Sequence, residues 1–237
     1  MVHPYELYYW PSIQGRGEFI RLALEEAGAD YVDVARREGG VDLLMAALEV
    51  EQYPAFAPPF IKAGELVIGQ VATILLYLGE QHGLAPRTEP GRLWVHQLQL
   101  TIADLVTEAH DTHHPIASAL YYDDQKPEAL RRSADFIESR IPKFMGYFAR
   151  LLSNPEPRDY LTGDKLTYAD LSLFQVIEGL RYAFPNAMKT IEQEYPVLTG
   201  LRDRVAAQPN IAAYLASERR IPFNEEGIFR RYPELDQ

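Results

Sequence analysis

Hydroxyl-bearing side chains gather near the start of the chain, in the segment LYYWPSIQGRG (residues 7–17). Tyr8, Tyr9 and Ser12 carry these hydroxyl groups, and Trp10 stands between them. A hydroxyl group at the end of a strand can donate a hydrogen bond to a reacting group. The alternative for each tyrosine is simple packing in an aromatic core strand.

The alternation of side chains along a strand separates the two tyrosines. Tyr5, Leu7 and Tyr9 fall on one face of the predicted strand, and Tyr8 and Trp10 fall on the other. Tyr9 lies nearest the strand end among the residues of its face. This parity places Tyr9 at the strand end and predicts that Tyr8 packs under a helix, but by itself it leaves simple packing as the favoured role of either tyrosine.

The composition limits the chemistry that this chain can perform. It has 237 residues, no cysteine and a formal net charge of −11, and its basic residues form no patch. A protein thiol is thus excluded as nucleophile or redox group, and nucleic acid is not an expected partner. The chain shows no signal peptide and no apolar run long enough to cross a membrane, so we expect a cytoplasmic protein.

Two other motifs suggest chemistry that we do not assign. Gly15-Arg16-Gly17 resembles part of a nucleotide-binding loop, but Ile20 stands where the third glycine would be. His110 and His114 are one helical turn apart and can bind zinc as a pair. Further ligands are not evident beside them, so no metal site is predicted.

Hydrophobic periodicity divides the chain into a mixed part and a helical part. Strands are expected at 5–10, 31–34, 60–62 and 66–68, and helices at 18–28, 41–48 and 70–81. After a Pro- and Gly-containing stretch, helices are expected at 93–110, 127–152 with a kink at Pro142, from 167 onward, and at 195–207 and 211–219. The tail from residue 221 is expected to lie along the surface.

Four segments also match the motifs of one superfamily. They read YWPSIQGRGEFIR (9–21), PPFIKAG (58–64), QVATILLYL (70–78) and LTGDKLTYADL (161–171). Together they resemble the glutathione S-transferase superfamily, in particular its tyrosine-type (alpha, mu, pi and sigma) classes. The resemblance implies an α/β thioredoxin-like N-terminal domain (1–82), a linker (83–91) and an all-α C-terminal domain (92–237).

The resemblance also implies a function and a first set of site residues. It implies a detoxifying transferase that activates the thiolate of glutathione, its co-substrate, for attack on an apolar electrophile, with no other cofactor. Tyr9 takes the catalytic position, and Ser12 is the alternative used by serine-type classes. A second role for Ser12, which we favour, is to cap the following helix. Cysteine-type classes are excluded.

Glutathione binding is assigned by the resemblance to Arg16, Pro58, Pro59, Gln70 and Val71. Pro59 is the expected cis-proline. Two positions depart from the family pattern. Pro58 lacks the N–H that normally pairs with the cysteinyl backbone of glutathione. Val71 replaces a serine, so a hydroxyl contact is lost, although its backbone N–H remains available.

The resemblance places the electrophile in the helical domain. Trp10, His110, His114, Tyr121 and Tyr122 are the expected lining of its site. A homodimer is also implied. In some family members an acid on this helix reaches the glutathione of the partner subunit, and the sequence does not decide whether Asp104, Glu108 or neither does so here. The competing class of function is a glutathione-binding or ligand-binding protein of the same fold without turnover.

Overall fold

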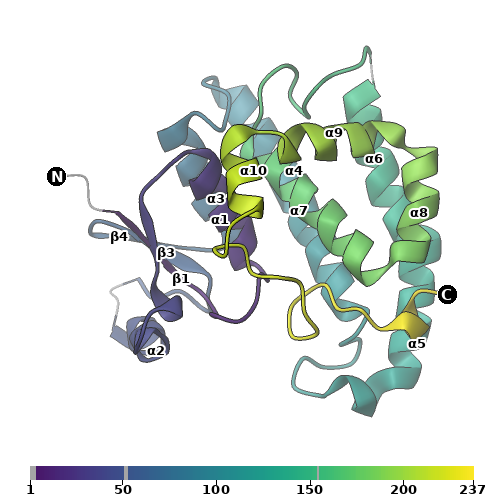
Figure 1. The fold of residues 1–237 in the computed structure, drawn as a ribbon, viewed down its shortest axis with the longest axis horizontal. Coiled ribbons are helices and arrows are strands. Elements are labelled where there is room, and N and C mark those ends of the chain that lie inside the picture. Colours follow the sequence, from purple (N-terminus) through teal and green to yellow (C-terminus); the bar gives the residue numbers. More distant parts are fainter. Residues whose placement is uncertain (1–3, 51–52, 154) are drawn as a thin grey trace.

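The computed structural model describes residues 4–50, 53–153 and 155–237. Its first part is a four-stranded mixed sheet in the order β2-β1-β3-β4 (Figure 1). The strands are β1 (Tyr5–Tyr8), β2 (Tyr31–Asp33), β3 (Phe60–Ala63) and β4 (Leu66–Gly69). β1 pairs parallel with β2 and antiparallel with β3, and β3 and β4 form the predicted hairpin.

Helices cover both faces of this sheet. They are α1 (Gly17–Glu26), α2 (Gly40–Val50) and α3 (Val71–His82), with a short 3₁₀ turn η1 (Val34–Arg36) before α2. Leu7 faces the main core beneath α1 and α3, whereas Tyr8 packs in a smaller core with Leu44 of α2. The alternation predicted for the first strand is therefore confirmed, because its neighbouring residues enter different cores.

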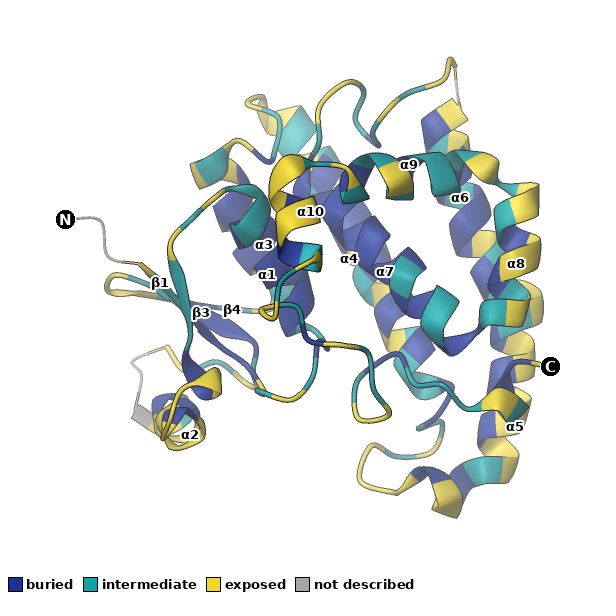
Figure 2. Cartoon of the chain, in the orientation of Figure 1, coloured by how far each residue is buried: buried dark blue, intermediate teal, exposed yellow. Residues whose placement is uncertain are grey.

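The rest of the described chain is helical, so the fold class expected from the sequence is confirmed. The helices are α4 (Glu89–Asp111), α5 (Lys126–Asp135), α6 (Ile141–Ser153), α7 (Tyr168–Ala183), α8 (Pro185–Glu194), α9 (Pro196–Ala206) and α10 (Pro209–Leu215), with short turns η2 (Tyr122–Gln125) and η4 (Pro233–Leu235). α7 is buried along almost its whole length at the centre of this part (Figure 2). Within the described ranges, no helix combines the length and apolarity needed to span a membrane.

One helix prediction holds and one helix was missed. The helix expected at 127–152 runs without a break through α5, a π-helical stretch η3 (Phe136–Arg140) and α6, with the irregular stretch just before Pro142. Proline removes a helical N–H and displaces the carbonyl four residues earlier, which is residue 138 within that stretch. The sequence missed α8, which begins directly at Pro185.

The passage between the two parts is shorter than the sequence suggested. α4 begins at Glu89, and the Thr88 hydroxyl accepts a hydrogen bond from the Gly91 N–H at 3.3 Å. Pro90 lies in the first turn, where its missing N–H has no cost. The last three residues of the predicted linker are thus helical, and the domain boundaries remain a prediction.

A buried charged network ties α1 to the helical part. Arg21 is fully buried and lies 2.7 Å from Asp33 and 3.3 Å from Glu18. Glu18 also accepts a hydrogen bond from the Tyr214 hydroxyl at 2.7 Å and pairs with Arg220. Because breaking a buried ion pair leaves an uncompensated charge, this network fixes the two parts of the chain against each other.

The last residues, 221–237, form a segment that we call the C-terminal strap. It passes from α10 across the loop after β1 and on to α5, where Glu234 pairs with Lys126 at the start of that helix (Figure 1). Ile228 and Phe229 are buried in the main core, and Phe229 packs so closely on Gly179 that a side chain there would collide with its ring. The expectation of a surface tail was therefore wrong for these residues.

The motif at 161–171 builds the start of α7. Asp170 is fully buried and accepts hydrogen bonds from the Leu161 N–H at 2.8 Å, the Thr167 N–H at 2.8 Å and the Thr167 hydroxyl at 2.7 Å. Burial raises the pKa of Asp170 to about 6, against the lowering effect of these hydrogen bonds. Thr167 and Asp170 thus form a capping box at the start of α7, and Asp170 has a structural role.

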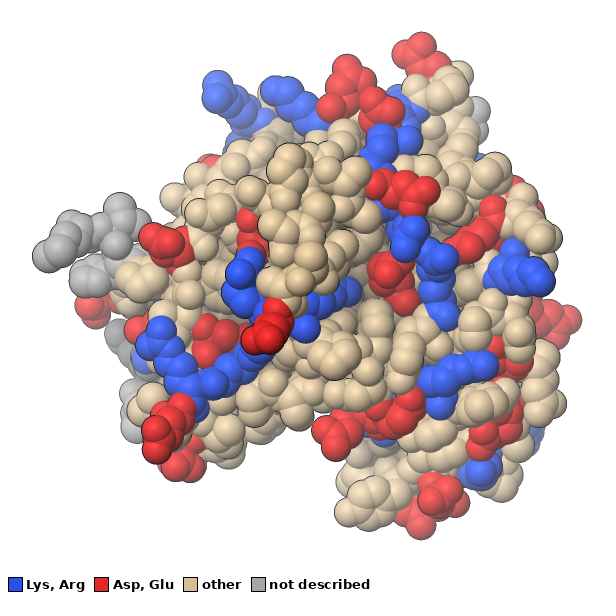
Figure 3. Space-filling view, in the orientation of Figure 1, with Lys and Arg blue, Asp and Glu red and all other residues tan. Residues whose placement is uncertain are grey.

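Charged side chains are interspersed on the face of the molecule in view. Figure 3 shows Lys and Arg next to Asp and Glu over α7, α8 and α9. Several are paired, such as Arg202 with Glu178 at 2.7 Å and Arg181 with Glu192 at 3.1 Å. This face therefore presents mixed charge and no continuous basic surface.

Candidate functional site

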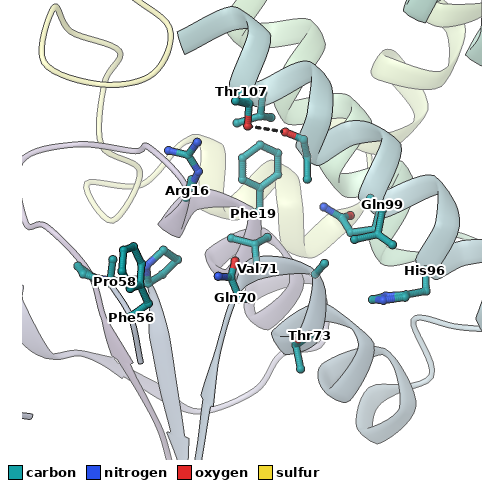
Figure 4. Close-up of a pocket in the computed structure, with 16 residues that line it drawn as sticks. Arg16, Phe19, Phe56, Pro58, Gln70, Val71, Thr73, His96, Gln99 and Thr107 are labelled. Carbon is teal, nitrogen blue, oxygen red and sulfur yellow. Dashed lines mark hydrogen bonds between the residues drawn. The ribbon is translucent and has the colours of Figure 1, made fainter. Parts of the chain in front are cut away.

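A cavity of about 560 Å³ lies between the sheet part of the chain and α4 (Figure 4). It is lined by the start of α1, the loop before β3, the start of α3 and one side of α4. Arg16, Pro58, Pro59, Gln70 and Val71 all line it. The fold thus brings together every residue that the sequence assigned to glutathione, and their role in binding remains a prediction.

The loop before β3 supplies one wall of the cavity. The peptide bond between Pro58 and Pro59 is cis, as predicted. Because Pro58 has no N–H, it offers an extended ligand only its carbonyl oxygen. Phe56, which also lines the cavity, is 98% exposed.

The start of α3 supplies a second wall. Gln70 precedes the helix with a φ of 64°, and in the described part of the chain it is the single non-glycine residue with positive φ. Its side chain does not cap the helix. Val71, Ala72 and Thr73 all line the cavity, and as the first residues of α3 their N–H groups have no partners within the helix. Such a helix start attracts anions.

Tyr9 lies directly behind the cavity wall at Arg16. Its hydroxyl oxygen accepts a hydrogen bond from the Arg16 backbone N–H at 2.9 Å, and its side chain is 4% exposed. Gly15 and Gly17 pack so closely on the ring that a side chain at either position would collide with it. Tyr9 does not itself line the 560 Å³ cavity.

Burial determines the protonation of Tyr9. It raises the pKa of the Tyr9 hydroxyl, although the Arg16 N–H and the positive charges of Arg16 and Arg21 act to lower it. The hydroxyl therefore keeps its proton at neutral pH. No acceptor for that proton lies within hydrogen-bonding distance among the described residues.

The two neighbours of Tyr9 in the motif are placed differently. Ser12 is exposed, and its hydroxyl donates a long hydrogen bond of 3.4 Å to Glu226 of the C-terminal strap. No side chain caps α1, so the capping role favoured for Ser12 was wrong. Trp10 is 38% exposed and lines neither this cavity nor the second one described below.

Three histidine rings pack together at the end of α4. The ring centroids of His110 and His114 are 5.0 Å apart, and His113 lies edge-on to both. His113 Nε2 lies 2.8 Å from the Ile228 carbonyl, and its Nδ1 lies 2.6 Å from His114 Nδ1. Since a carbonyl only accepts, His113 carries its proton on Nε2 and accepts through Nδ1 from the protonated Nδ1 of His114.

This cluster is neutral at physiological pH. Burial lowers the pKa of His113 to about 3 and that of His114 to about 4, and it also lowers the pKa of His110. The positive charge of Arg230 contributes in the same direction. No group of three His, Cys, Asp or Glu side chains in the described ranges is arranged to hold a metal ion.

A second cavity, of about 420 Å³, lies between the end of α4 and the C-terminal strap. His114, Tyr121 and Tyr122 line it, together with charged groups such as Arg230. The Tyr122 ring stacks on Tyr232 with centroids 3.9 Å apart. His110 and Trp10 do not line it, so the five residues predicted for the electrophile site do not converge on one cavity.

The two acids considered for a contact across a dimer differ in their partners. Glu108 lies 2.7 Å from Arg140 and 3.3 Å from Arg132. The hydrogen bond from Arg140 lowers the pKa of Glu108. Asp104 is exposed, and no hydrogen bond or ion pair engages it among the described residues.

The sequence analysis missed three polar residues that the fold places at these sites. His96 and Gln99 line the 560 Å³ cavity from α4, and Arg230 lines the second cavity from the strap. The available signal was weak. Gln99 directly follows the buried Leu98, so it borders the apolar face of the helix. Arg230 lies on a segment without periodicity, which no local pattern could place.

Comparisons with known proteins agree with the fold. The family model described as "Glutathione S-transferase, C-terminal domain" matches residues 110–218. Among solved structures, "prostaglandin synthase D of Nilaparvata lugens" superposes with a TM-score of 0.72 at 21% identity, covering 93% of this chain and all of that one. A pi-class glutathione S-transferase of Onchocerca volvulus superposes with a TM-score of 0.68 at 21% identity, covering 90% and 92%.

Curated relatives extend along most of the chain. A glutathione S-transferase of Plasmodium falciparum is 23% identical over 224 residues, covering 90% of this chain and 95% of that protein. "Glutathione S-transferase P 1" of Xenopus laevis is 28% identical over 222 residues, covering 91% and 93%. "Glutathione S-transferase Mu 4" of Homo sapiens is 26% identical over 221 residues, covering 91% and 92%.

Proposed function

The chain belongs to the glutathione S-transferase superfamily, and from this premise we propose that it is a glutathione transferase in which Tyr9 stabilises the glutathione thiolate. One observation carries the proposal. The Tyr9 hydroxyl accepts a hydrogen bond from the Arg16 N–H at 2.9 Å, while its own proton has no acceptor among the described residues. That proton is therefore available to a ligand sulfur.

The hydrogen bond from Arg16 also improves Tyr9 as a donor. Donation to the phenolic oxygen draws electron density from the O–H bond, so this bond becomes a stronger donor. Burial meanwhile keeps the hydroxyl protonated. Both effects favour a neutral hydroxyl that stabilises an anion beside it.

One hydroxyl group can supply the free energy that is needed to lower the pKa of the glutathione thiol. A free thiol has a pKa of about 8.5, and lowering it by about two units requires about 2.7 kcal/mol. A hydrogen bond to a charged group contributes about 1.5–3 kcal/mol. The thiol proton leaves to water, and the sulfur forms its bond to carbon while the leaving group departs or the added carbon takes up a proton.

The 560 Å³ cavity suits an anionic peptide such as glutathione. Arg16 is the one charged side chain in its lining among the described residues, and no carboxylate lines it. The uncapped start of α3 offers N–H groups to a carboxylate, with Gln70 beside them. Two family contacts are absent, the Pro58 N–H and the hydroxyl at Val71, and each costs about 1 kcal/mol of affinity.

The electrophile is proposed to dock beside the end of α4. His114, Tyr121 and Tyr122 line the 420 Å³ cavity there, and the His110 ring stacks on that of His114 with centroids 5.0 Å apart. The stacked tyrosine rings suit the apolar body predicted from the sequence. The serine-type alternative is less well supported, because Ser12 is exposed and donates to Glu226.

A spectroscopic titration tests the proposal. Bound glutathione should ionise with a pKa of about 6.5, about two units below the free thiol. The thiolate absorbs in the ultraviolet, so difference spectra of the complex against pH report the ionisation directly. A bound thiol that ionises as in water contradicts the proposal and favours the non-catalytic binding protein.

We also propose a homodimer. Exposed apolar side chains lie on the loop before β3, on β4 and on α4, namely Phe56, Leu66, Leu93 and Leu100. Burial of such side chains drives association, and the unengaged Asp104 lies on the same helix. Sedimentation velocity should give twice the 27.0 kDa mass of the chain.

The proposed interface predicts a specific mutational effect. Phe56→Ser, on the loop before β3, should shift the protein toward the monomer. Leu43→Ser changes an exposed apolar residue of α2, outside the proposed interface, and should leave the dimer intact. An unchanged sedimentation coefficient for Phe56→Ser would remove that loop from the interface. The cytoplasmic location and the role in detoxification remain predictions.

A further inference from the structure

Gln14 is a buried polar residue in the loop that leads from Tyr9 to Arg16. It lies between β1 and α1 and is 5% exposed. Its Nε2 donates to the carbonyl of Ile221 in the C-terminal strap, and its Oε1 accepts from Gln175 Nε2 of α7 at 2.7 Å. Gln14 lines neither the 560 Å³ cavity nor the 420 Å³ cavity, so its position gives it no contact with a substrate there.

Gln14 belongs to a closed ring of hydrogen bonds. Gln175 is fully buried, and its Oε1 accepts from Arg220 Nη2 at 3.0 Å. Arg220 pairs through Nη1 with Glu18, and the Glu18 N–H donates to the Gln14 carbonyl at 3.0 Å. The ring joins the loop to α1, to α7 and to the residue before the strap. Buried polar groups that are bonded in this way hold one another in a single arrangement.

The loop cannot shift without changing the surroundings of the Tyr9 hydroxyl. Only Gly15 separates Gln14 from Arg16, whose N–H donates to the Tyr9 oxygen at 2.9 Å. Gly15 has a φ of 44°, and a Cβ atom there would lie 2.1 Å from the same oxygen. Hydrogen bonds weaken steeply with length and angle, so a displacement of this peptide by about 1 Å would break the bond from Arg16.

We propose that Gln14 is a positioning residue, whose doubly bonded amide holds the Arg16 peptide against the Tyr9 hydroxyl and so sets how strongly that hydroxyl stabilises the thiolate. This inference rests on the proposed function. Gln14 acts through Arg16 and Tyr9 and does not touch the reacting atoms. Through Gln14, α7 and the C-terminal strap both influence the ionisation of the bound thiol.

The variant Gln14→Met tests this role, because it nearly preserves the shape of the side chain and removes both hydrogen bonds of the amide. The measurement is the ultraviolet titration of bound glutathione. Its midpoint should rise by about half a pH unit, because the Tyr9 hydroxyl remains but loses part of the polarisation that Arg16 supplies. S-methylglutathione, which has no ionisable thiol, should bind with a dissociation constant that changes by less than about twofold.

A second titration shows whether Gln14 acts through Tyr9. In a Tyr9→Phe protein the hydroxyl is absent, so adding Gln14→Met should leave the midpoint where Tyr9→Phe alone places it. A shift of equal size in both backgrounds, or no shift in Gln14→Met, overturns the role of Gln14 and leaves the proposed function intact. If the thiol bound to the unmodified protein ionises as in water, the proposed function itself fails and this inference fails with it.

Gln208→Met is the matched control. The Gln208 amide likewise ties separate segments together, since its Nε2 donates to the Tyr160 hydroxyl at 2.9 Å and to the Arg204 carbonyl at 3.3 Å. Its replacement should lower the stability of the protein and leave the midpoint of the thiol titration unchanged. An equal rise in this variant would mean that the midpoint responds to any loosening of the fold, which contradicts a specific role for Gln14.

Should Gln14→Met not fold, Gln14→Asn decides the question. The shorter side chain keeps an amide but lacks the length to bond Ile221 and Gln175 together, so the midpoint should rise in this variant as well. An unchanged midpoint in the folded Gln14→Asn protein counts against the proposal. Circular dichroism of each variant identifies which of them are folded.

Discussion

Replacing Tyr9 with phenylalanine should lower kcat/KM for conjugation of glutathione to an aryl halide by about 50-fold at pH 6.5. The Tyr9 hydroxyl is proposed to lower the pKa of the thiol by about two units, and at this pH the loss of that shift reduces the thiolate fraction from about one half to about one hundredth. The ring remains, so its packing against Gly15 and Gly17 is preserved. Glutathione affinity should change little, because the proposal places the hydroxyl at the sulfur only.

The pH dependence separates this explanation from a general loss of structure. As the pH rises toward 9, water ionises the thiol in the variant as well, so the deficit should shrink to a few-fold. Tyr8→Phe is the matched control. The Tyr8 hydroxyl donates to Glu6 at 2.6 Å on the opposite face of the sheet, and its ring stacks on Phe60.

Two outcomes would contradict the assignment. Unchanged turnover in Tyr9→Phe would transfer the catalytic role to Ser12, which Ser12→Ala then tests. A deficit of constant size across the pH range would mean that Tyr9 supports the structure of the site and does not stabilise the thiolate. The two results call for different explanations, and a single pH–rate profile distinguishes them.

Replacing Asp170 with alanine should cost about 3–5 kcal/mol of the free energy of unfolding. The side chain accepts hydrogen bonds from the buried N–H groups of Leu161 and Thr167. Each buried donor left without a partner costs about 1–3 kcal/mol, and the lost capping box adds about 1 kcal/mol. Because typical domains are stable by about 5–15 kcal/mol, urea denaturation should show a much lower midpoint.

Asp164→Ala provides the control in the same segment. Asp164 is exposed and has no hydrogen bond or ion pair among the described residues. Its replacement should change the free energy of unfolding by less than about 0.5 kcal/mol. Equal midpoints for the two variants would show that the buried start of α7 tolerates unpaired N–H groups, contrary to the role assigned to Asp170.

Local sequence patterns identified much of the fold. The alternation of Leu7 and Tyr8 assigned them correctly to opposite faces of the sheet, since that geometry follows from the strand itself. The helix that begins after Thr167 and the irregular turn near Pro142 were also predicted, because both depend on residues close in the chain. The sequence missed α8.

The candidate site depended on both kinds of information. The motifs around Arg16, Pro59 and Gln70 identified residues that the fold then gathered around one cavity, although they are far apart in the chain. Tyr9 was singled out by face parity and motif. Only the tertiary structure shows that the Tyr9 hydroxyl oxygen accepts a hydrogen bond from the Arg16 N–H, which leaves the hydroxyl proton available for donation.

The sequence by itself determined the fold class, the absence of a protein thiol and the choice of Tyr9, since composition, periodicity and short motifs are properties of neighbouring residues. The tertiary structure alone decided which polar groups find a hydrogen-bond partner and which do not. The Oε1 of Gln99 lacks a partner among the described residues, the Ser12 hydroxyl donates to Glu226, and His113 bonds to the carbonyl of Ile228. The two observed contacts join residues more than 100 positions apart. No local pattern encodes such pairings, because they depend on how whole helices and the C-terminal strap pack together.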